Sequence, residues 1–158
     1  MGAVGRIDYY HVSGAPKANS LVVGGCAVVP DAAGRILLQR RADNGQWALP
    51  GGGMDLGETF GDSVVREVRE ETGFEVTIKR IVGVYSDPGH VFAYDSGEIR
   101  QQFSICCACA IVGGELAVSA ESTAVDFFTP DELAALHMHP THRLRIADYL
   151  ADKQPVLR

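Results

Sequence analysis

The sequence has no apolar run of the roughly 18 to 20 residues that a helix needs to cross a bilayer. Residues 1–20 also lack the charged start and apolar stretch of a secretory signal. Positive charge is scarce, because 14 basic residues stand against 20 acidic ones and the formal net charge is −6. Such a chain has no global positive field to hold a nucleic-acid backbone or an anionic membrane. We therefore expect a cytoplasmic protein with a small-molecule partner and with neither nucleic acid nor membrane as a partner.

Cysteine is limited to four residues, and all of them lie in apolar, strand-like segments. Cys106 and Cys109 have the spacing of half a zinc site, but no second Cys or His pair stands at a matching interval. Free thiols in such segments behave as small buried hydrophobes. We therefore expect Cys26, Cys106, Cys107 and Cys109 to be reduced core residues.

A length of 158 residues fits one domain, and a hydrophobic content of 46% with 22% charged residues is typical of globular proteins. Apolar runs bounded by turn residues predict strands at 21–29, 35–39, 76–85, 91–94, 99–112 and 124–128, the first two forming a hairpin. Helices are predicted from Thr59 to Gly73, from Thr129 to about residue 138, and from Thr141 to about residue 150. This order favours an α/β sandwich in which one mixed sheet lies between helices.

The first predicted helix carries three carboxylates on one edge. At about 100° per residue, Glu67, Glu70 and Glu71 fall within one narrow arc beside an apolar face. Like charges at these spacings repel, so the arrangement suggests that a cation sits between them. A hard ion such as magnesium prefers oxygen ligands, and the glycine-rich loop at 45–57 can bring backbone carbonyls close. An acidic face of this kind is usually only solvated, so its context has to decide.

That context resembles the Nudix hydrolase family. The Nudix box reads Gly-x5-Glu-x7-Arg-Glu-U-x-Glu-Glu-x-Gly-U, where U is a bulky apolar residue. Every position is satisfied here, by Gly52, Glu58, Arg66, Glu67, Val68, Glu70, Glu71, Gly73 and Phe74. The strand at 34–41, the segment Trp47–Pro50 and the segment Thr129–Leu133 also look like the family. We accordingly assign residues 21–158 to a Nudix hydrolase domain and residues 1–20 to an N-terminal extension.

The resemblance implies a metal site for Mg²⁺, with Mn²⁺ as a substitute. Glu70 and Glu71 match the principal metal-binding carboxylates, and Glu67 matches a ligand that is the general base in some members. Gly51, just before the box, matches a ligand through its backbone carbonyl. Arg66 and Glu58 match residues that brace the acidic helix and the loop.

A further acid often reaches the site from a downstream loop in this family. Glu121 stands at a matching place, five residues before Asp126-Phe127-Phe128, and Glu98 and Glu115 are rivals. We expect Glu121 to be a metal ligand or a base. The general base stays open between Glu67 and Glu121.

Substrate contacts lie outside the box. The candidates are Arg40, Arg41, Trp47, Tyr85 and His90, although the aromatic residues can equally fill the core and the arginines can be solvated. His137, His139 and His142 are expected to be surface or capping residues.

The resemblance implies hydrolysis of a diphosphate linkage in a nucleoside diphosphate joined to another moiety, such as ADP-ribose or a nucleotide sugar. A proline at position 88, shortly after the box, favours this class only slightly. One alternative is a nucleoside triphosphate pyrophosphohydrolase of the housecleaning type. Another is a catalytically retired nucleotide-binding domain, against which the complete box argues. Many relatives are dimers, so a homodimer stays open.

Overall fold

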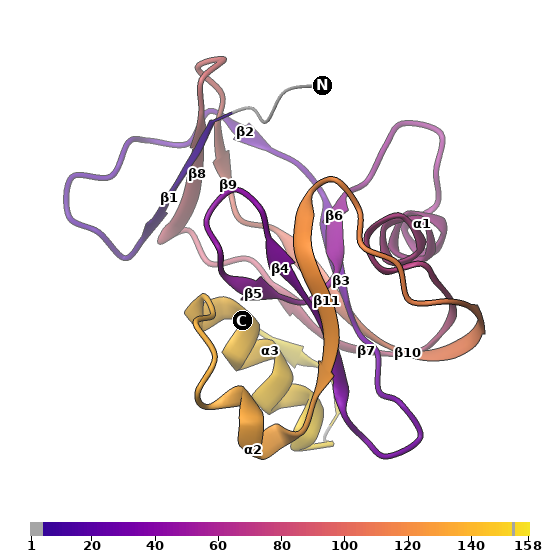
Figure 1. Ribbon diagram of the computed structural model, residues 1–158. Coiled ribbons are helices and arrows are strands. Elements are labelled where there is room, and N and C mark those ends of the chain that lie inside the picture. Colours follow the sequence, from indigo (N-terminus) through magenta and orange to yellow (C-terminus); the bar gives the residue numbers. More distant parts are fainter. Residues whose placement is uncertain (1–4, 153) are drawn as a thin grey trace.

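The computed structural model describes residues 5–152 and 154–158, and its strands form three sheets (Figure 1). The strands are β1 (Arg6–Tyr10), β2 (Ser20–Leu21), β3 (Gly24–Val28), β4 (Ile36–Arg41), β5 (Trp47–Ala48), β6 (Gly51–Gly53), β7 (Phe74–Tyr85), β8 (His90–Tyr94), β9 (Ile99–Gln101), β10 (Ser104–Gly114), β11 (Ser122–Phe128) and β12 (Val156–Leu157). The helices are α1 (Phe60–Thr72), α2 (Pro130–Leu133) and α3 (Pro140–Leu150). None of these helices is long and apolar enough to cross a membrane.

The central sheet has the order β12-β7-β10-β3-β6 and is mixed, because β10 runs parallel to β3 and antiparallel to β7. Helix α1 packs on one face, where Val64 and Val68 join a core cluster with Leu37. Helices α2 and α3 cover the other face, where Ile146 packs with Leu38 (Figure 1). The predicted α/β sandwich around a mixed sheet is therefore confirmed.

The predicted hairpin between residues 21–29 and 35–39 is right only at its turn. The backbone N–H of Asp31 donates to the carbonyl of Arg35 at 2.9 Å, and that of Leu37 donates to Val29 at 3.0 Å. Beyond this point β4 leaves β3 and pairs with β11 and β5 in a separate three-stranded sheet. Leu37 and Leu38 are both fully buried, on opposite faces of the strand. A strand covered on both faces has no alternating pattern that would identify its partner.

The N-terminal strand β1 belongs to a four-stranded sheet of order β1-β8-β9-β2. It pairs antiparallel with β8 along its whole length, from Arg6 opposite Tyr94 to Tyr10 opposite His90. The single strand predicted at 99–112 is divided at residues 102–103, because β9 stays in this sheet while β10 enters the central one. Residues 6–10 thus pair with a strand of the domain that follows them.

Helix α1 begins and ends where its sequence predicts. Thr59 Oγ1 accepts the backbone N–H of Asp62 at 3.1 Å, and Gly73 closes the helix with a φ of 83°. A Cβ atom at Gly73 would also lie 2.0 Å from the carbonyl oxygen of Glu115, so both conformation and space require glycine there. The limits of the acidic helix are therefore confirmed.

The second predicted helix is too long. Helix α2 ends at Leu133 rather than near residue 138, because the chain turns at residues 134–135 and then reaches β5 at residue 138. Met138 forms a parallel bridge to Trp47, whose backbone N–H donates to the carbonyl of His137 at 2.8 Å. Helix α3 follows at Pro140, and the side chain of His139 caps it. The predicted capping role of this histidine is confirmed.

The four cysteines are free and buried, as predicted. Cys26 and Cys106 stand opposite each other in the parallel pair of β3 and β10, and both face the α3 side. Cys107 and Cys109 belong to the cluster on the α1 side. The thiols therefore fill the core on both faces of the central sheet.

Candidate active site on helix α1

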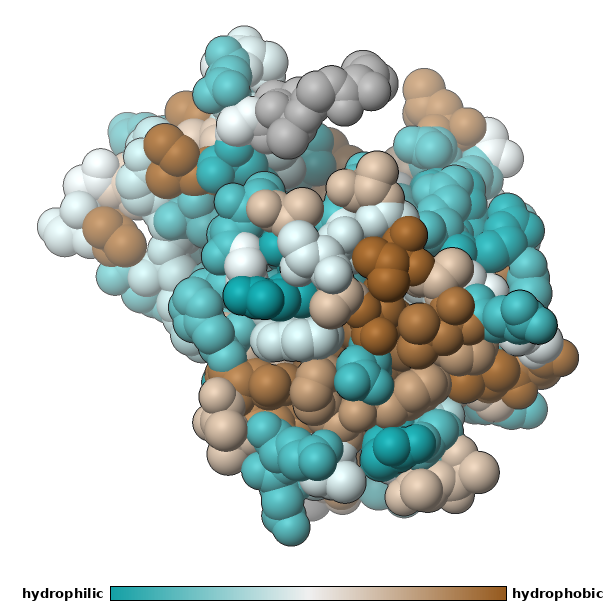
Figure 2. Space-filling model, in the orientation of Figure 1, coloured by the Kyte–Doolittle hydropathy of each residue, from teal (hydrophilic) through white to brown (hydrophobic). Residues whose placement is uncertain are grey.

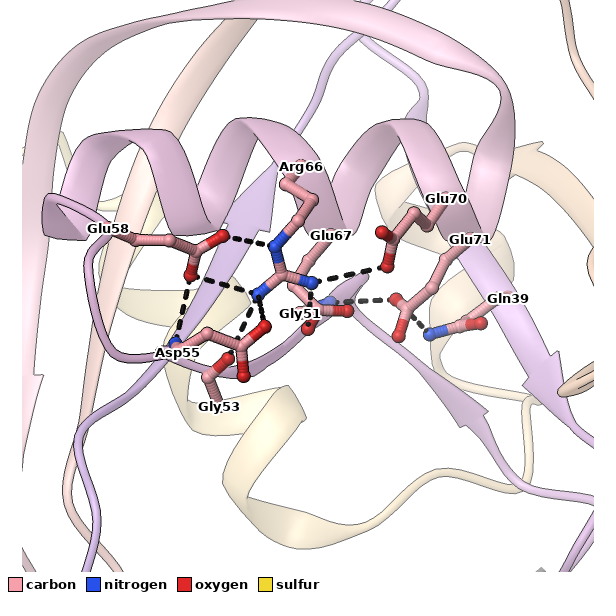
Figure 3. A network of polar contacts seen from close by, with 9 residues as sticks. All are labelled: Gln39, Gly51, Gly53, Asp55, Glu58, Arg66, Glu67, Glu70 and Glu71. Carbon is pink, nitrogen blue, oxygen red and sulfur yellow. Dashed lines mark hydrogen bonds and ion pairs between the residues drawn. The ribbon is translucent and has the colours of Figure 1, made fainter. Parts of the chain in front are cut away.

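Helix α1 presents its three carboxylates toward the glycine-rich loop (Figure 3). Glu71 is only 6% exposed, Glu67 is half-buried and Glu70 is exposed. Figure 2 shows hydrophilic side chains gathered over the region of this helix. The structure thus brings together the three glutamates that the sequence places on one helical edge.

Glu71 is held at the junction of α1 with two sheets. Its Oε2 accepts the backbone N–H of Gly51 at 2.9 Å and Nε2 of Gln39 at 2.5 Å. Oε1 of Gln39 in turn accepts the hydroxyl of Ser122 at 2.5 Å. Gln39 and Ser122 were not among the residues predicted for the site. The available signal was the neutral amide of Gln39 directly after the apolar run 36–38, since an amide buried with that run needs polar partners.

Two glycines let the loop backbone lie against these acids. A Cβ atom on Gly52 would stand 2.5 Å from Oε1 of Glu67. A Cβ atom on Gly51 would stand 2.1 Å from the carbonyl oxygen of Gly25 on the neighbouring strand β3. Both separations are below ordinary contact distances. A larger residue at position 51 would push β6 away from the backbone of β3, whereas one at position 52 would displace the Glu67 carboxylate. Glycine at both positions therefore keeps β6 paired with β3 and leaves room for Glu67.

Arg66 connects the helix to the loop. Its guanidinium donates to both oxygens of Glu58, to Oε1 of Glu67 at 3.0 Å and to Oε2 of Glu70 at 3.2 Å (Figure 3). It also donates to the carbonyl of Gly53 at 3.2 Å. The hydrogen bond from Arg66 lowers the pKa of Glu58. The structure thus places Arg66 and Glu58 where they can brace the acidic residues.

Glu71, the most buried acid of the cluster, has hydrogen-bond donors but no cationic partner among the described residues. Burial raises the pKa of Glu71 to about 8, and the charges of Glu67 and Glu121 add to this effect. The hydrogen bonds from Gly51 and Gln39 oppose it. Burial also raises the pKa of Glu67, although the hydrogen bond from Arg66 acts against the shift. Oxygen donors crowded in this way fit a hard divalent cation, which restores the charged form of each carboxylate.

Glu121 lies immediately before β11 and is exposed. Its backbone carbonyl accepts the N–H of Ala42 at 2.9 Å, and its charge reaches both Glu67 and Glu71. The rival Glu98 lies just before β9, and its carboxylate accepts hydrogen bonds from Ser20 at 2.8 Å and from Arg100 at 3.0 Å. The other rival, Glu115, is exposed in the loop after β10.

The proposed substrate residues are scattered. Arg40 is exposed and donates to the carbonyl of Gly45 at 3.1 Å, while Arg41 pairs with Asp43 at 2.5 Å. Trp47 packs edge-on against Phe128 with ring centroids 4.7 Å apart. These three residues lie on β4 and β5 of one sheet, with Arg40 opposite Trp47.

Tyr85 and His90 lie on the side of the sheet that α3 covers. Tyr85 is buried, donates its hydroxyl to Asp148 at 2.8 Å, and lines a cavity of about 380 Å³. The buried guanidinium of Arg145 stands 5.0 Å from the centre of the Tyr85 ring and lines the same cavity. His90 is also buried, and its ring stacks on that of His139. This cavity is therefore lined by residues other than the α1 carboxylates.

Comparisons with known proteins agree with this arrangement. A family model described as the NUDIX domain matches residues 21–150. A MutT-like protein of Streptomyces ambofaciens is 38% identical over 90% of this chain and 84% of that protein. An ADP-ribose pyrophosphatase of Methanocaldococcus jannaschii is 36% identical over 73% of this chain and 66% of that protein. A nucleoside triphosphatase of Escherichia fergusonii is 30% identical over 70% of this chain and 84% of that protein.

A solved structure shares the fold. A NUDIX hydrolase from Nitrosomonas europaea superposes with a TM-score of 0.70 at 23% identity, covering 85% of this chain and 91% of that one. The sequence comparisons therefore show the family, and the solved structure agrees with them in fold.

The buried position of Glu71 predicts a pH-dependent stability in metal-free protein. Because its folded pKa is about 8, above an unfolded value of about 4.3, the folded state holds the proton more tightly. This stabilisation is complete below about pH 4 and is lost as the pH rises through about 8. The denaturant midpoint in EDTA should fall across this window, and it should fall less in Glu71→Gln. Equal pH slopes in the two proteins would contradict the assignment.

Proposed function

Because the chain belongs to the Nudix hydrolase family, we propose that it hydrolyses the diphosphate linkage of a nucleoside diphosphate joined to another group, such as ADP-ribose or a nucleotide sugar. The observation that supports catalysis is the crowded carboxylate cluster of α1 against the glycine backbone of β6. A cluster that served only as a solvated face would not bury Glu71. The arrangement therefore supports a cation site between the α1 carboxylates and the backbone of β6.

The ligands that we assign to Mg²⁺, with Mn²⁺ as a substitute, are Glu67, Glu70, Glu71, Glu121 and the backbone carbonyl of Gly51. All of them offer oxygen, which magnesium prefers. When bound, the ion neutralises phosphate oxygens and lowers the pKa of a water molecule.

The protein's own residues orient the reacting groups. Arg66 fixes Glu67 and Glu70, while Gly51 and Gln39 fix Glu71. The attacking water loses its proton to a carboxylate, and either Glu67 or Glu121 accepts it. Glu67 is pre-oriented by Arg66, and its raised pKa makes it a better proton acceptor. Glu121 is exposed to water, so it can exchange the proton with solvent.

The choice of substrate class has two supports. The relative from Methanocaldococcus jannaschii is named an ADP-ribose pyrophosphatase and is 36% identical. Pro88 also stands in the turn between β7 and β8, on the rim of the 380 Å³ cavity. The alternative is a nucleoside triphosphate pyrophosphohydrolase, and the Escherichia fergusonii relative, named a nucleoside triphosphatase, speaks for it.

Neutralising either principal carboxylate should disable the enzyme. Glu70→Gln and Glu71→Gln should each lower turnover with Mg²⁺ by at least ~10²-fold, because charge stabilisation in the transition state contributes several kcal/mol. Glu75→Gln is a matched control, since Glu75 follows the helix and pairs only weakly with Arg69 at 3.7 Å. It should keep nearly full turnover. Unchanged rates in the first two variants would remove these residues from the site.

Glu121 should matter for turnover rather than for stability. Its side chain is exposed, so Glu121→Gln should leave the melting temperature almost unchanged while it depresses the turnover number by ~10²-fold, as expected for loss of a general base or a ligand. Glu115→Gln and Glu98→Gln should be nearly silent in turnover. A large loss at Glu98 with none at Glu121 would reassign the role.

The products separate the two substrate classes. ADP-ribose should give AMP and ribose 5-phosphate without pyrophosphate, whereas a nucleoside triphosphate would give a monophosphate and pyrophosphate. Catalytic efficiencies should be compared for ADP-ribose, nucleotide sugars, and common and oxidised triphosphates, with pyrophosphate assayed in each case. Robust pyrophosphate release from a triphosphate, with ADP-ribose and nucleotide sugars left intact, would favour the alternative class.

A further inference from the structure

A second group of metal-binding side chains lies away from the α1 acids. Asp8 on β1, His90 at the start of β8 and His139 at the cap of α3 each direct one ligand atom to a common point, and these atoms lie within 4.8 Å of one another. We propose that these three residues bind a transition-metal ion of the Zn²⁺ class. The two sites differ in chemistry, because the α1 cluster offers only oxygen whereas this one offers two imidazoles and a carboxylate.

His90 is the residue that most needs such a ligand. Its side chain is only 3% exposed, and neither ring nitrogen has a hydrogen-bond partner among the described residues. Nine in ten or more buried polar groups in proteins do have a partner, because an unmade bond inside the core is costly. A neutral imidazole offers one bare nitrogen, and coordination to a metal ion would satisfy it.

His139 can exist in two tautomers, and its contacts differ between them. As the cap of α3, Nδ1 accepts the backbone N–H of Thr141 at 3.2 Å, so the proton is on Nε2. In the other tautomer Nδ1 carries the proton and donates to the hydroxyl of Thr141 at 2.9 Å, and Nε2 has the lone pair that can bind a metal ion. Metal binding selects that tautomer, and the hydroxyl then orients the ring as an outer partner of the ligand.

Arg6 holds the carboxylate of Asp8 in place. Its carboxylate accepts two hydrogen bonds from Arg6, at 2.6 Å and 2.9 Å, and the guanidinium lies 4.2 Å from the centre of the Phe92 ring. Carboxylates that bind metals are commonly held by such outer hydrogen bonds. Both residues lie on β1, and Phe92 of the paired strand β8 stands opposite Asp8, so the carboxylate is held in a defined orientation.

Binding requires a small closure of the three side chains. The two imidazole rings are now stacked nearly parallel, 9° apart in plane and 4.8 Å apart at their centres. Zinc ligands stand about 2.0 to 2.2 Å from the ion, so the rings must tilt and draw their nitrogens together. Tyr10 packs edge-on against both rings and also lines the 380 Å³ cavity, so only this ring needs to move to bring the cavity next to the two imidazoles. Three protein ligands leave the fourth position to water or another ligand.

The ion would join parts of the chain that are distant in sequence. It would connect the N-terminal strand β1, strand β8 and the start of α3. A ligand that binds only the folded state stabilises it in proportion to ligand concentration. Occupation of this site should therefore raise the melting temperature even when the α1 site is disabled.

Cobalt titration tests the proposal, because Co²⁺ bound by imidazole is visible spectroscopically. EDTA-stripped Glu70→Gln/Glu71→Gln protein, in which the α1 site is disabled, should bind one Co²⁺ with visible absorption bands. In that background, Asp8→Asn and His139→Gln should each weaken Co²⁺ binding by at least ~10-fold. Both residues are half-buried, so their variants, checked by circular dichroism, are milder than changes at His90. His137→Gln, an exposed histidine of the same loop, is the matched control and should bind normally.

Two results would overturn the proposal. One is an unchanged Co²⁺ affinity in folded Asp8→Asn and His139→Gln proteins. The other is the absence of both cobalt absorption and any Zn²⁺-induced rise in melting temperature in the Glu70→Gln/Glu71→Gln protein, which keeps the three proposed ligands.

Discussion

The burial of one carboxylate, that of Glu71, holds the candidate active site together. The Oε2 atom of this residue joins three elements, because it belongs to α1 and accepts hydrogen bonds from Gly51 of β6 and Gln39 of β4. These strands belong to two different sheets, and Ser122 of β11 extends the connection through Gln39. A buried charge without such donors would be strongly disfavoured. The side chain of Glu71 thus fixes the position of α1 relative to both sheets.

The rest of the site follows from that contact. Gly51 lets β6 lie close to β3, and Gly52 leaves room beside β6 for the Glu67 carboxylate. Arg66 then neutralises the exposed end of the cluster and ties it to the loop, but it leaves Glu71 without a cationic partner. The negative charge of the exposed acids is therefore neutralised by Arg66, whereas that of Glu71 is not. A divalent ion would be stabilised most strongly next to Glu71. Stability and metal binding make opposite demands on this carboxyl group.

The two faces of the central sheet carry different chemistry. The α1 face presents carboxylate oxygens, which suit a hard ion and phosphate groups. The α3 side gathers the imidazoles of His90 and His139, the buried guanidinium of Arg145 and the thiols of Cys26 and Cys106. Ligand softness is thus a physical basis for keeping two metals apart in one small domain.

The sequence by itself determined the features that depend on local chemistry. The cap at Thr59, the left-handed stop at Gly73 and the shared arc of Glu67, Glu70 and Glu71 all follow from backbone rules within one helix. The buried, reduced state of the cysteines follows from the apolar runs around them.

Only the tertiary structure decided the features that depend on distant partners. Strand β4 pairs with β11 instead of β3, since a strand buried on both faces carries no mark of its neighbour. Helix α2 ends early at a turn, and residue 138 forms a bridge to Trp47 of β5 instead of continuing the helix. Gln39 reaches Glu71 across 32 positions, and Asp8 meets His90 and His139 only after three elements pack. Long-range packing of this kind leaves no periodic pattern in the sequence, because each contact depends on a residue that is distant along the chain.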